Sequence, residues 1–242
     1  MSADIAKFNA AQAALEYIKD GMIVGLGTGS TANHFINALA EKAKAGLNVK
    51  CIPTSQASAK LAQSLGLTLT TLDEHPFVDI TVDGTDEIDG SFRLIKGGGG
   101  ALLLEKIVAS SSKYMVVIAD ESKQVKQLGA FPLPIEVVPF GLTATRNLMK
   151  SLAYDAGCSG EMTLRLRPDG TRFLTDNGNY IVDCAFGEIA DPEALDDALK
   201  LVPGVVENGL FLGLADLGVF AGPEGVTVIS SEELDFEEGE TV

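Results

Sequence analysis

The stretch Gly25-Leu26-Gly27-Thr28-Gly29-Ser30-Thr31 indicates the fold of this chain. It follows the apolar run 22–26, which predicts a short buried strand, and precedes residues 32–45, whose pattern predicts a helix. Its glycines let the backbone turn tightly and approach a ligand, and the free N–H groups at a helix start bind phosphate. The spacing matches neither a Walker loop nor a dinucleotide fingerprint. Taken alone, the stretch fits a phosphate-binding turn and a plain capped turn equally well.

Strand and helix patterns alternate on both sides of this turn. Ile5, Phe8, Leu15 and Ile18 have helical spacing and predict a first helix that ends at Gly21. Further strands are predicted at 49–53, 68–72, 79–82, 93–95 and 114–119, and further helices at 55–65 and 101–110. Such alternation is typical of a mostly parallel sheet with helices on both faces, so we expect a Rossmann-like α/β fold.

The pattern changes after Gly129. Helices are predicted at 142–156 and 192–201, and strands at 161–166, 172–175 and 180–185, with a hairpin turn at Pro168-Asp169-Gly170. This run fits a small α+β module of the ferredoxin-like kind, and residues 226–229 predict a return to the main sheet. We therefore expect a Rossmann-like catalytic domain from residues 1–129 and 207–242, and an inserted smaller α+β domain from 130–206 that serves oligomerisation.

Composition excludes several classes of protein. The chain has 242 residues and a formal net charge of −16, and such a surface repels nucleic acid and anionic membranes. No apolar run reaches the ~20 residues that span a bilayer. Cys51, Cys158 and Cys184 are far apart and form no C-x-x-C pair, which favours the reducing cytoplasm. The segment 232–240 has six acidic residues and no basic one, and we expect a solvated tail there.

Two aspartates follow the predicted strand 79–82. Asp83 and Asp86 bracket a glycine at its carboxyl end, where open α/β sheets place ligands. Paired carboxylates there can share a proton, hydrogen-bond sugar hydroxyls or hold a divalent metal, and Asp-Gly is also common in plain turns. A metal is the weaker functional option, because neither histidine of the chain lies in these motifs. Glu87 and Asp89 follow at once, and we expect them to be solvated.

Lys96 precedes four consecutive glycines, Gly97–Gly100. Four glycines in a row are entropically costly, so a backbone that passes beside a ligand explains them better than a bare connector. The lysine offers a compact positive charge for a phosphate or a developing enolate oxygen. Glu105 lies in the first turns of the next helix, where a surface glutamate would also complement the helix dipole. Its place after the glycines favours a proton acceptor.

Five motifs, by their order and spacing, resemble the ribose-5-phosphate isomerase family of the A type. They are Gly25–Thr31, Asp83-Gly84-Thr85-Asp86-Glu87, Lys96–Ala101, Glu105-Lys106 and Ala119-Asp120-Glu121-Ser122-Lys123. The resemblance implies an aldose–ketose isomerase of the pentose phosphate pathway that interconverts D-ribose 5-phosphate and D-ribulose 5-phosphate without cofactor or metal. It also implies a homodimer or a homotetramer.

The resemblance assigns roles to individual residues. Glu105 would be the proton acceptor, and Asp83, Asp86 and Lys96 would be further catalytic residues. The implied substrate site consists of Lys7, Thr28, Gly29, Ser30, Thr31, Asp83, Gly84, Thr85, Asp86, Lys96, Gly97, Gly98, Gly99 and Lys123. The chemistry agrees, because one carboxylate can move a proton between C1 and C2 of the sugar while a lysine and backbone amides hold the enediolate oxygen. Which aspartate does what in opening the sugar ring stays undecided.

Two other classes of protein are alternatives. A coenzyme A transferase of related fold would use a glutamate to attack a thioester, but no sign of an acyl-CoA pocket exists beyond the glycine loops. A non-catalytic sugar-phosphate sensor would carry a basic DNA-binding module, whereas this chain has 18 Lys plus Arg against 34 Asp plus Glu.

Overall fold

The structure, a computed structural model, describes residues 1–231, so the predicted acidic tail at 232–240 lies outside the described residues. The chain divides into two compact units. Unit 1 consists of Met1–Thr85, Leu104–Lys123 and the described chain from Gly213 onward, and unit 2 consists of Asp86–Leu103 and Gln124–Leu212. No helix within residues 1–231 is long and apolar enough to cross a membrane.

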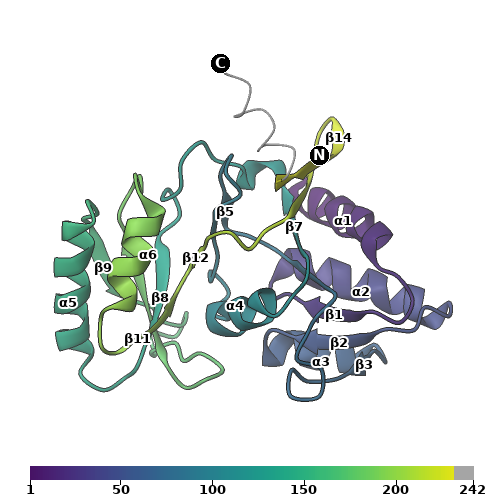
Figure 1. The fold of residues 1–242 in the computed structure, drawn as a ribbon, viewed down its shortest axis with the longest axis horizontal. Helices are drawn as coiled ribbons and strands as arrows, with labels where there is room; N and C mark the ends of the chain where they lie inside the picture. Colours follow the sequence, from purple (N-terminus) through teal and green to yellow (C-terminus); the bar gives the residue numbers. More distant parts are fainter. Residues whose placement is uncertain (232–242) are drawn as a thin grey trace. The chain divides into compact units, whose positions relative to one another are not determined.

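Unit 1 is built on a seven-stranded sheet of order β14-β13-β7-β4-β1-β2-β3 (Figure 1). Its strands are β1 (Ile23–Leu26), β2 (Lys50–Pro53), β3 (Thr68–Leu69), β4 (Ile80–Asp83), β7 (Met115–Asp120), β13 (Leu217–Gly222) and β14 (Gly225–Ser230). Neighbouring strands are parallel except β14, which forms an antiparallel hairpin with β13 at one edge. The predicted mostly parallel α/β sheet is confirmed, and so is the return of residues 226–229 to it.

Helices cover both faces of this sheet. α1 (Ala3–Ala14), α2 (Ser30–Lys44) and α3 (Gln56–Ser64) pack on one face, whose core includes Phe35, Leu39 and Val82. A short 3-10 helix, η1 (Leu15–Tyr17), follows α1. On the other face, α4 (Leu102–Ser110) contributes Val108 to a second apolar cluster. The short strands are therefore buried on both sides, as a parallel sheet requires.

The first helix forms but ends at Ala14 and not at Gly21, and only two of its four predicted apolar residues, Leu15 and Ile18, are buried in the core. Ile5 and Phe8 are 52% and 46% exposed, whereas Ala6, Ala10 and Ala14 are buried. Figure 1 shows α1 and α2 side by side, and they are in contact. Alanine side chains let the α1 backbone approach its neighbours at the packing density of a protein interior, which larger side chains would prevent.

Unit 2 contains two antiparallel sheets. The smaller has the order β12-β6-β5 and consists of β5 (Glu87–Ile88), β6 (Leu94–Ile95) and β12 (Leu210–Phe211). The larger has the order β11-β8-β10-β9 and consists of β8 (Leu133–Val137), β9 (Glu161–Leu164), β10 (Tyr180–Ala185) and β11 (Val205–Asn208). α5 (Leu142–Asp155) and α6 (Pro192–Lys200) cover one face of it. The β-α-β-β-α-β chain order confirms the predicted ferredoxin-like module.

The predicted strand at 172–175 does not form. Only an isolated β-bridge occurs there, at Arg172, and the chain beyond it turns. Glu136, a fully buried residue of β8, holds the turn through its Oε1 atom. That oxygen accepts hydrogen bonds from the side chains of Thr175, Asn177 and Asn179. Side-chain bonds of this kind offer the backbone an alternative to strand pairing, and here the alternative prevails.

The predicted inserted segment, residues 130–206, lies within unit 2. Unit 2 also includes residues 86–103 and the residues on both flanks of the segment, 124–129 and 207–212. The smaller sheet accounts for part of this extension, because β12 pairs with β6. The predicted domain boundaries stay predictions, since a compact unit records packing and not independent folding.

Candidate active site

The polar motifs of unit 1 lie at the carboxyl ends of three neighbouring strands. β1, β4 and β7 are adjacent and parallel, so the segments that follow them meet at one edge of the sheet. These segments are the glycine turn 27–29, residues 83–85, and the 3-10 helix η2 (Glu121–Lys123). The order of the strands switches direction between β1 and β4, and open α/β sheets bind ligands at such a switch point.

Asp83 organises the polar contacts at this edge. Its side chain is 1% exposed, and its Oδ1 accepts hydrogen bonds from the backbone N–H groups of Thr28 (3.1 Å) and Gly84 (2.7 Å). A Cβ atom on Gly27 would lie 2.1 Å from Asp83 Oδ1, so only glycine fits beside the carboxylate. The glycine turn is therefore required by a contact inside the protein, between residues 56 positions apart that no local sequence pattern connects.

The glycine turn and the start of α2 carry hydroxyl groups beside one lysine. Thr28 Oγ1 lies 2.8 Å from Thr54 Oγ1 and donates to Ser55 Oγ at 2.8 Å. Lys7 of α1 donates to Ser30 Oγ at 3.0 Å, which places a positive charge beside the N-terminus of α2. A helix N-terminus with such a lysine can bind a phosphate. Thr54 and Ser55 are absent from the predicted site, although their position after β2 was a signal for this edge.

The remaining predicted residues of unit 1 lie on separate elements. Glu105 belongs to α4 and is 4% exposed, so it is not a solvated surface glutamate. Lys123 is half-buried at the end of η2, and Thr85 is half-buried after β4. Gly29 is the N-cap of α2 with a φ of +109°. Thr31 lies within 4 Å of the position that a Cβ on Gly84 would take.

In unit 2, a hydrogen bond joins Asp86 to the glycine run. Gly98 N–H donates to Asp86 Oδ2 at 2.7 Å, and a Cβ on Gly98 would lie 2.6 Å from Asp86 Oδ1. Gly97 and Gly100 have φ values of +103° and +81°, a region that favours glycine. Gly98 and Gly99 are exposed. The run is thus a backbone turn beside a carboxylate, with two accessible residues at its tip.

Lys96 is almost fully buried at the base of this turn, with 2% of its surface exposed. Its backbone N–H donates to the carbonyl oxygen of Gly209 at 2.9 Å, and its Nζ lies 5.5 Å from the centroid of the Phe211 ring. A cation over an aromatic face is stabilised electrostatically. A buried ammonium group needs such compensating interactions, because its removal from water is otherwise costly.

Glu87 and Asp89 are not solvated, so this prediction was wrong. Glu87 is 3% exposed and accepts hydrogen bonds from the N–H groups of Gly129 (2.7 Å) and Phe131 (2.5 Å). Asp89 is 5% exposed and forms an ion pair with Arg93 at 2.7 Å. Both carboxylates have the hydrogen-bonding partners that a buried charge requires, and both hold neighbouring segments of unit 2 together.

Thiol and metal chemistry find little support in the described residues. Burial raises the pKa of Cys51 to about 12, and it also raises the pKa of Cys158 and of Cys184. All three thiols therefore stay protonated near neutral pH, and they serve as packing residues. Within residues 1–231, no group of three or more His, Cys, Asp and Glu side chains is arranged to hold a metal ion.

Comparison with known proteins agrees with the motifs. The family model for ribose 5-phosphate isomerase A (phosphoriboisomerase A) matches residues 50–225. The chain is 55% identical to ribose-5-phosphate isomerase A of Parvibaculum lavamentivorans, over 96% of this chain and 100% of that protein.

Solved structures agree as well. The chain is similar to a D-ribose-5-phosphate isomerase in complex with phospho-erythronic acid, with a TM-score of 0.89, 37% identity, and coverage of 95% of this chain and 100% of that one. It is also similar to ribose 5-phosphate isomerase from Plasmodium falciparum, with a TM-score of 0.88, 40% identity, and coverage of 94% and 98%. The chain therefore belongs to the ribose-5-phosphate isomerase A family.

Proposed function

We propose that this chain interconverts D-ribose 5-phosphate and D-ribulose 5-phosphate, as an aldose–ketose isomerase of the pentose phosphate pathway. The observation that carries the proposal is family membership, with 55% identity over the whole length of a relative named ribose-5-phosphate isomerase A. The phospho-erythronic acid bound by a similar isomerase also fits this reaction. The two carboxylate oxygens of phospho-erythronic acid are coplanar, and so are the two oxygens of a cis-enediolate.

Glu105 is the proposed proton acceptor. Isomerisation removes a proton from C2 of the aldose and returns it to C1, and one carboxylate over both carbons can make both transfers. Glu105 is 4% exposed, so bulk water has little access to its carboxylate. A shielded base keeps the abstracted proton for the return step and limits side reactions of the enediolate.

Lys96 and the backbone of Gly97–Gly99 are proposed to hold the negative enediolate oxygen. A buried ammonium and fixed N–H groups are the donors that stabilise an oxyanion as it develops. Asp83 and Asp86 are proposed to open the closed sugar ring, which needs a proton donor at one oxygen and an acceptor at another. Each aspartate is already fixed by a backbone N–H bond, from Thr28 and Gly98 respectively.

The phosphate group is proposed to bind in unit 1. Lys7 lies against Ser30, the first residue of α2. Thr28 and Gly29 precede Ser30 in the turn, and Thr31 follows it in the helix. Lys123 is the second proposed cation, because η2 follows the strand next to β4. Gly84 and Thr85 complete the proposed lining. These groups act at short range, so they can bind an anionic substrate although the chain as a whole has a net charge of −16.

The remaining features of the proposal concern the enzyme as a whole. We propose that it needs neither cofactor nor metal, that it acts in the cytoplasm on a small sugar phosphate, and that it binds no nucleic acid or membrane. We also propose a homodimer or homotetramer. The acidic composition supports the lack of nucleic-acid and membrane binding, the unpaired thiols support the cytoplasm, and the family resemblance supports the remaining statements.

A first experiment measures isomerisation of ribose 5-phosphate in excess EDTA by the wild-type protein and by Glu105→Gln. We expect the wild type to turn over, and kcat of the variant to fall by ~10²–10⁴-fold, as for a lost general base. Exchange of solvent deuterium into C2 should stop in the variant. Glu16→Gln, which alters an exposed glutamate of the same unit, is the matched control. Another residue is the base if Glu105→Gln keeps above about a tenth of wild-type kcat.

A further inference from the structure

Arg165 of unit 2 contacts the backbone of the glycine run, although no sequence motif includes it. Its side chain is 14% exposed. Its Nη1 donates to the carbonyl oxygens of Gly97 (2.8 Å) and Gly98 (3.0 Å). Its Nε donates to Asp183 Oδ2 at 2.8 Å, and its Nη2 donates to Asp183 Oδ1. The guanidinium group therefore joins β10 to the glycine run with all three of its nitrogens.

These contacts fix the direction in which the glycine N–H groups point. The carbonyl and the N–H of one trans peptide group point to opposite sides of the chain. The Gly97 carbonyl faces Arg165, and the N–H of the same peptide group, that of Gly98, donates to Asp86 Oδ2. The Gly98 carbonyl also faces Arg165, so the Gly99 N–H points away from it. Glycine has little intrinsic preference that would hold these peptide groups in place.

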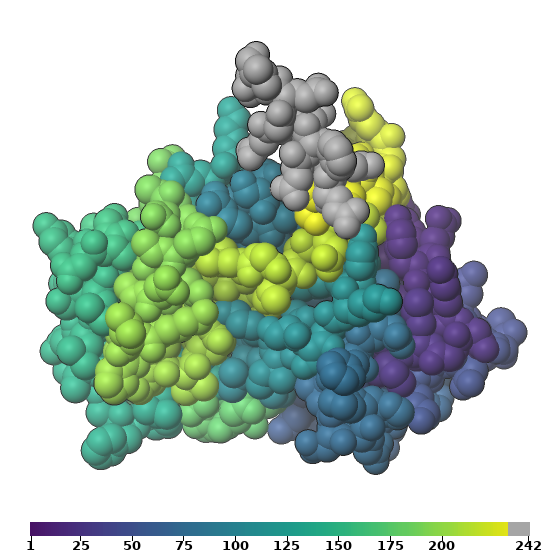
Figure 2. All heavy atoms as spheres, viewed as in Figure 1, coloured from purple at the N-terminus to yellow at the C-terminus, as the bar shows by residue number. Residues whose placement is uncertain are grey.

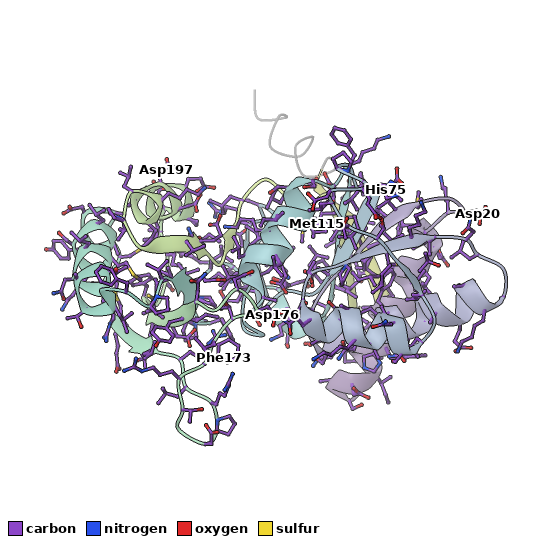
Figure 3. The ribbon with its side chains drawn as sticks, turned by 90° about the horizontal axis from the view of Figure 1, so that it is seen from below. Asp20, His75, Met115, Phe173, Asp176 and Asp197 are labelled. Atoms are coloured by element: carbon purple, nitrogen blue, oxygen red, sulfur yellow. The ribbon has the colours of Figure 1, made fainter. Side chains whose placement is uncertain are left out.

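Apolar side chains support the same run from the same module. A Cβ on Gly100 would lie 2.4 Å from Phe173 Cζ, and a Cβ on Gly97 would lie 3.2 Å from Pro134 Cβ, so both side chains contact the run. The Arg165 guanidinium lies 5.8 Å from the centroid of the Phe173 ring. Phe173, which is labelled in Figure 3, belongs to the chain segment between β9 and β10. The charged and the apolar contacts thus restrain one turn of backbone together.

We propose that Arg165, itself held by Asp183, is a positioning residue for isomerisation: it fixes the peptide groups 97–98 and 98–99 so that their N–H groups serve Asp86 and the enediolate oxygen. The inference rests on the proposed function and deepens it. The positive charge of Arg165, on the carbonyl side, also polarises these peptide groups and strengthens their N–H groups as donors. The segment 130–206 then supports catalysis, in addition to the oligomer interface expected of it.

Arginine is the residue that this position requires. Its planar fork can bind the Asp183 carboxylate with two nitrogens while the third reaches both carbonyls, whereas a lysine ammonium is a single point charge on a flexible stem. We therefore expect Arg165→Lys to behave like Arg165→Met in catalysis. Arg172→Met is the matched control, because Arg172 of the same module contacts Tyr180 by a hydrogen bond of 3.0 Å and by stacking at 5.4 Å.

The kinetic test compares Arg165→Met, Arg165→Lys and Arg172→Met with the wild type. We expect kcat to fall ~10–10²-fold in both Arg165 variants, somewhat less than for a deleted oxyanion donor, while KM for ribose 5-phosphate changes little. Affinity for phospho-erythronic acid should fall with kcat, because its carboxylate stands for the enediolate oxygens. Arg172→Met should leave all three quantities unchanged. Wild-type turnover is measured first. A wild type without turnover would contradict the proposed function, whereas an active wild type with unchanged kcat in Arg165→Met would contradict only the role of Arg165.

A double variant separates positioning from stability. Removing one member of a half-buried ion pair leaves an uncompensated charge, whereas removing both is often nearly neutral. We therefore expect Tm to fall in Arg165→Met and to recover in Arg165→Met/Asp183→Asn, while kcat stays low in both. The amide NMR resonances of Gly98 and Gly99 should shift in both variants and not in Arg172→Met. Recovery of kcat together with Tm, or unshifted glycine resonances, would overturn the proposal.

Discussion

At the scale of single residues, each aspartate of the motif Asp83–Asp86 is paired with a glycine of another motif. Gly27 lies against the carboxylate of Asp83, and Gly98 lies against that of Asp86. In both places the absent side chain lets a carboxylate reach a backbone N–H, that of Thr28 or of Gly98. A glycine and an aspartate therefore form one structural feature in each unit, Gly27 with Asp83 in unit 1 and Gly98 with Asp86 in unit 2. Neither glycine can be replaced without moving a carboxylate.

Gly98→Ala tests this pairing in unit 2. The new Cβ would lie 2.6 Å from Asp86 Oδ1, so the carboxylate must move and the 2.7 Å hydrogen bond must lengthen or break. Since the φ of Gly98 is not in the positive region, the backbone should tolerate alanine, and the unfolding free energy should change by about 1 kcal/mol or less. We expect kcat to fall by at least ~10-fold, towards the range for a lost acid–base group.

The control for this variant is Gly90→Ala in the same unit. No atom lies within 4 Å of the Cβ that it would add. Steady-state kinetics and thermal unfolding of both proteins provide the comparison. Equal kinetics in the two variants would show that the contact between Gly98 and Asp86 has no part in turnover.

The burial of individual polar residues was the property least predictable from the sequence. Glu87 and Asp89 follow a turn motif and have the composition of a solvated loop, yet both are buried. The N–H donors to Glu87 lie 42 and 44 residues away along the chain, and Arg165 lies 68 residues from Gly97. Local pattern contains no information on partners so distant, and the burial of a charge is decided by such partners.

At the scale of elements, periodicity predicted most helices and the parallel strands, but it failed for two central strands. The sequence pattern did not predict β8, because Pro134 interrupts its apolar run, although a proline near the start of a strand is tolerated. β13 was not predicted either, because Gly218 and Gly222 interrupt its apolar pattern. The Phe220 ring fills the space beside Gly218, where a Cβ would lie 2.4 Å from the ring. In both strands, tertiary packing outweighs the local signal.

Lys123 gives a test at this scale, because its position depends on the short η2 helix that follows β7. If Lys123 contributes a charge-assisted contact to the phosphate, Lys123→Ala should raise KM for ribose 5-phosphate by a factor equivalent to ~1.5–3 kcal/mol, with kcat largely retained. Lys126→Ala, which removes an exposed lysine three residues on, is the control. An equal loss on phosphorylated and unphosphorylated ribose would assign Lys123 to the chemistry instead.

At the scale of the whole molecule, the net charge of the chain limits the ways in which it can bind an anion. A net charge of −16 leaves anion binding to a few local donors, and Lys7, Lys96 and the start of α2 are donors of this kind. The sequence predicts a second module and the strand that contains β6, but it does not indicate that residues 86–103 belong to the same unit as residues 124–212. β5 has only two residues, and a strand so short carries no detectable period.

Unit 2 exposes apolar side chains on and beside α5, which supports the oligomer interface proposed for this unit. α5 exposes Leu148 and Tyr154, which are 47% and 72% exposed. A hollow of about 320 Å³ beside it is lined in part by Tyr154, Met162 and Phe186. Figure 2 shows α5, in green, at the surface of this unit. Apolar side chains around a hollow are typical of protein interfaces, and symmetric pairing of identical chains is the commonest way to cover them.

We therefore expect the wild type to be a homodimer or homotetramer, and Leu148→Glu/Tyr154→Glu to lower the mass measured by light scattering at micromolar concentration. A buried like-charge pair across a symmetric interface opposes association. The values of kcat and KM should stay close to those of the wild type, because neither side chain belongs to the proposed active site. Phe77→Glu, at a site that is 82% exposed in unit 1, should leave the mass unchanged. A monomeric wild type, or an unaltered mass in the double variant, would contradict the role proposed for this surface.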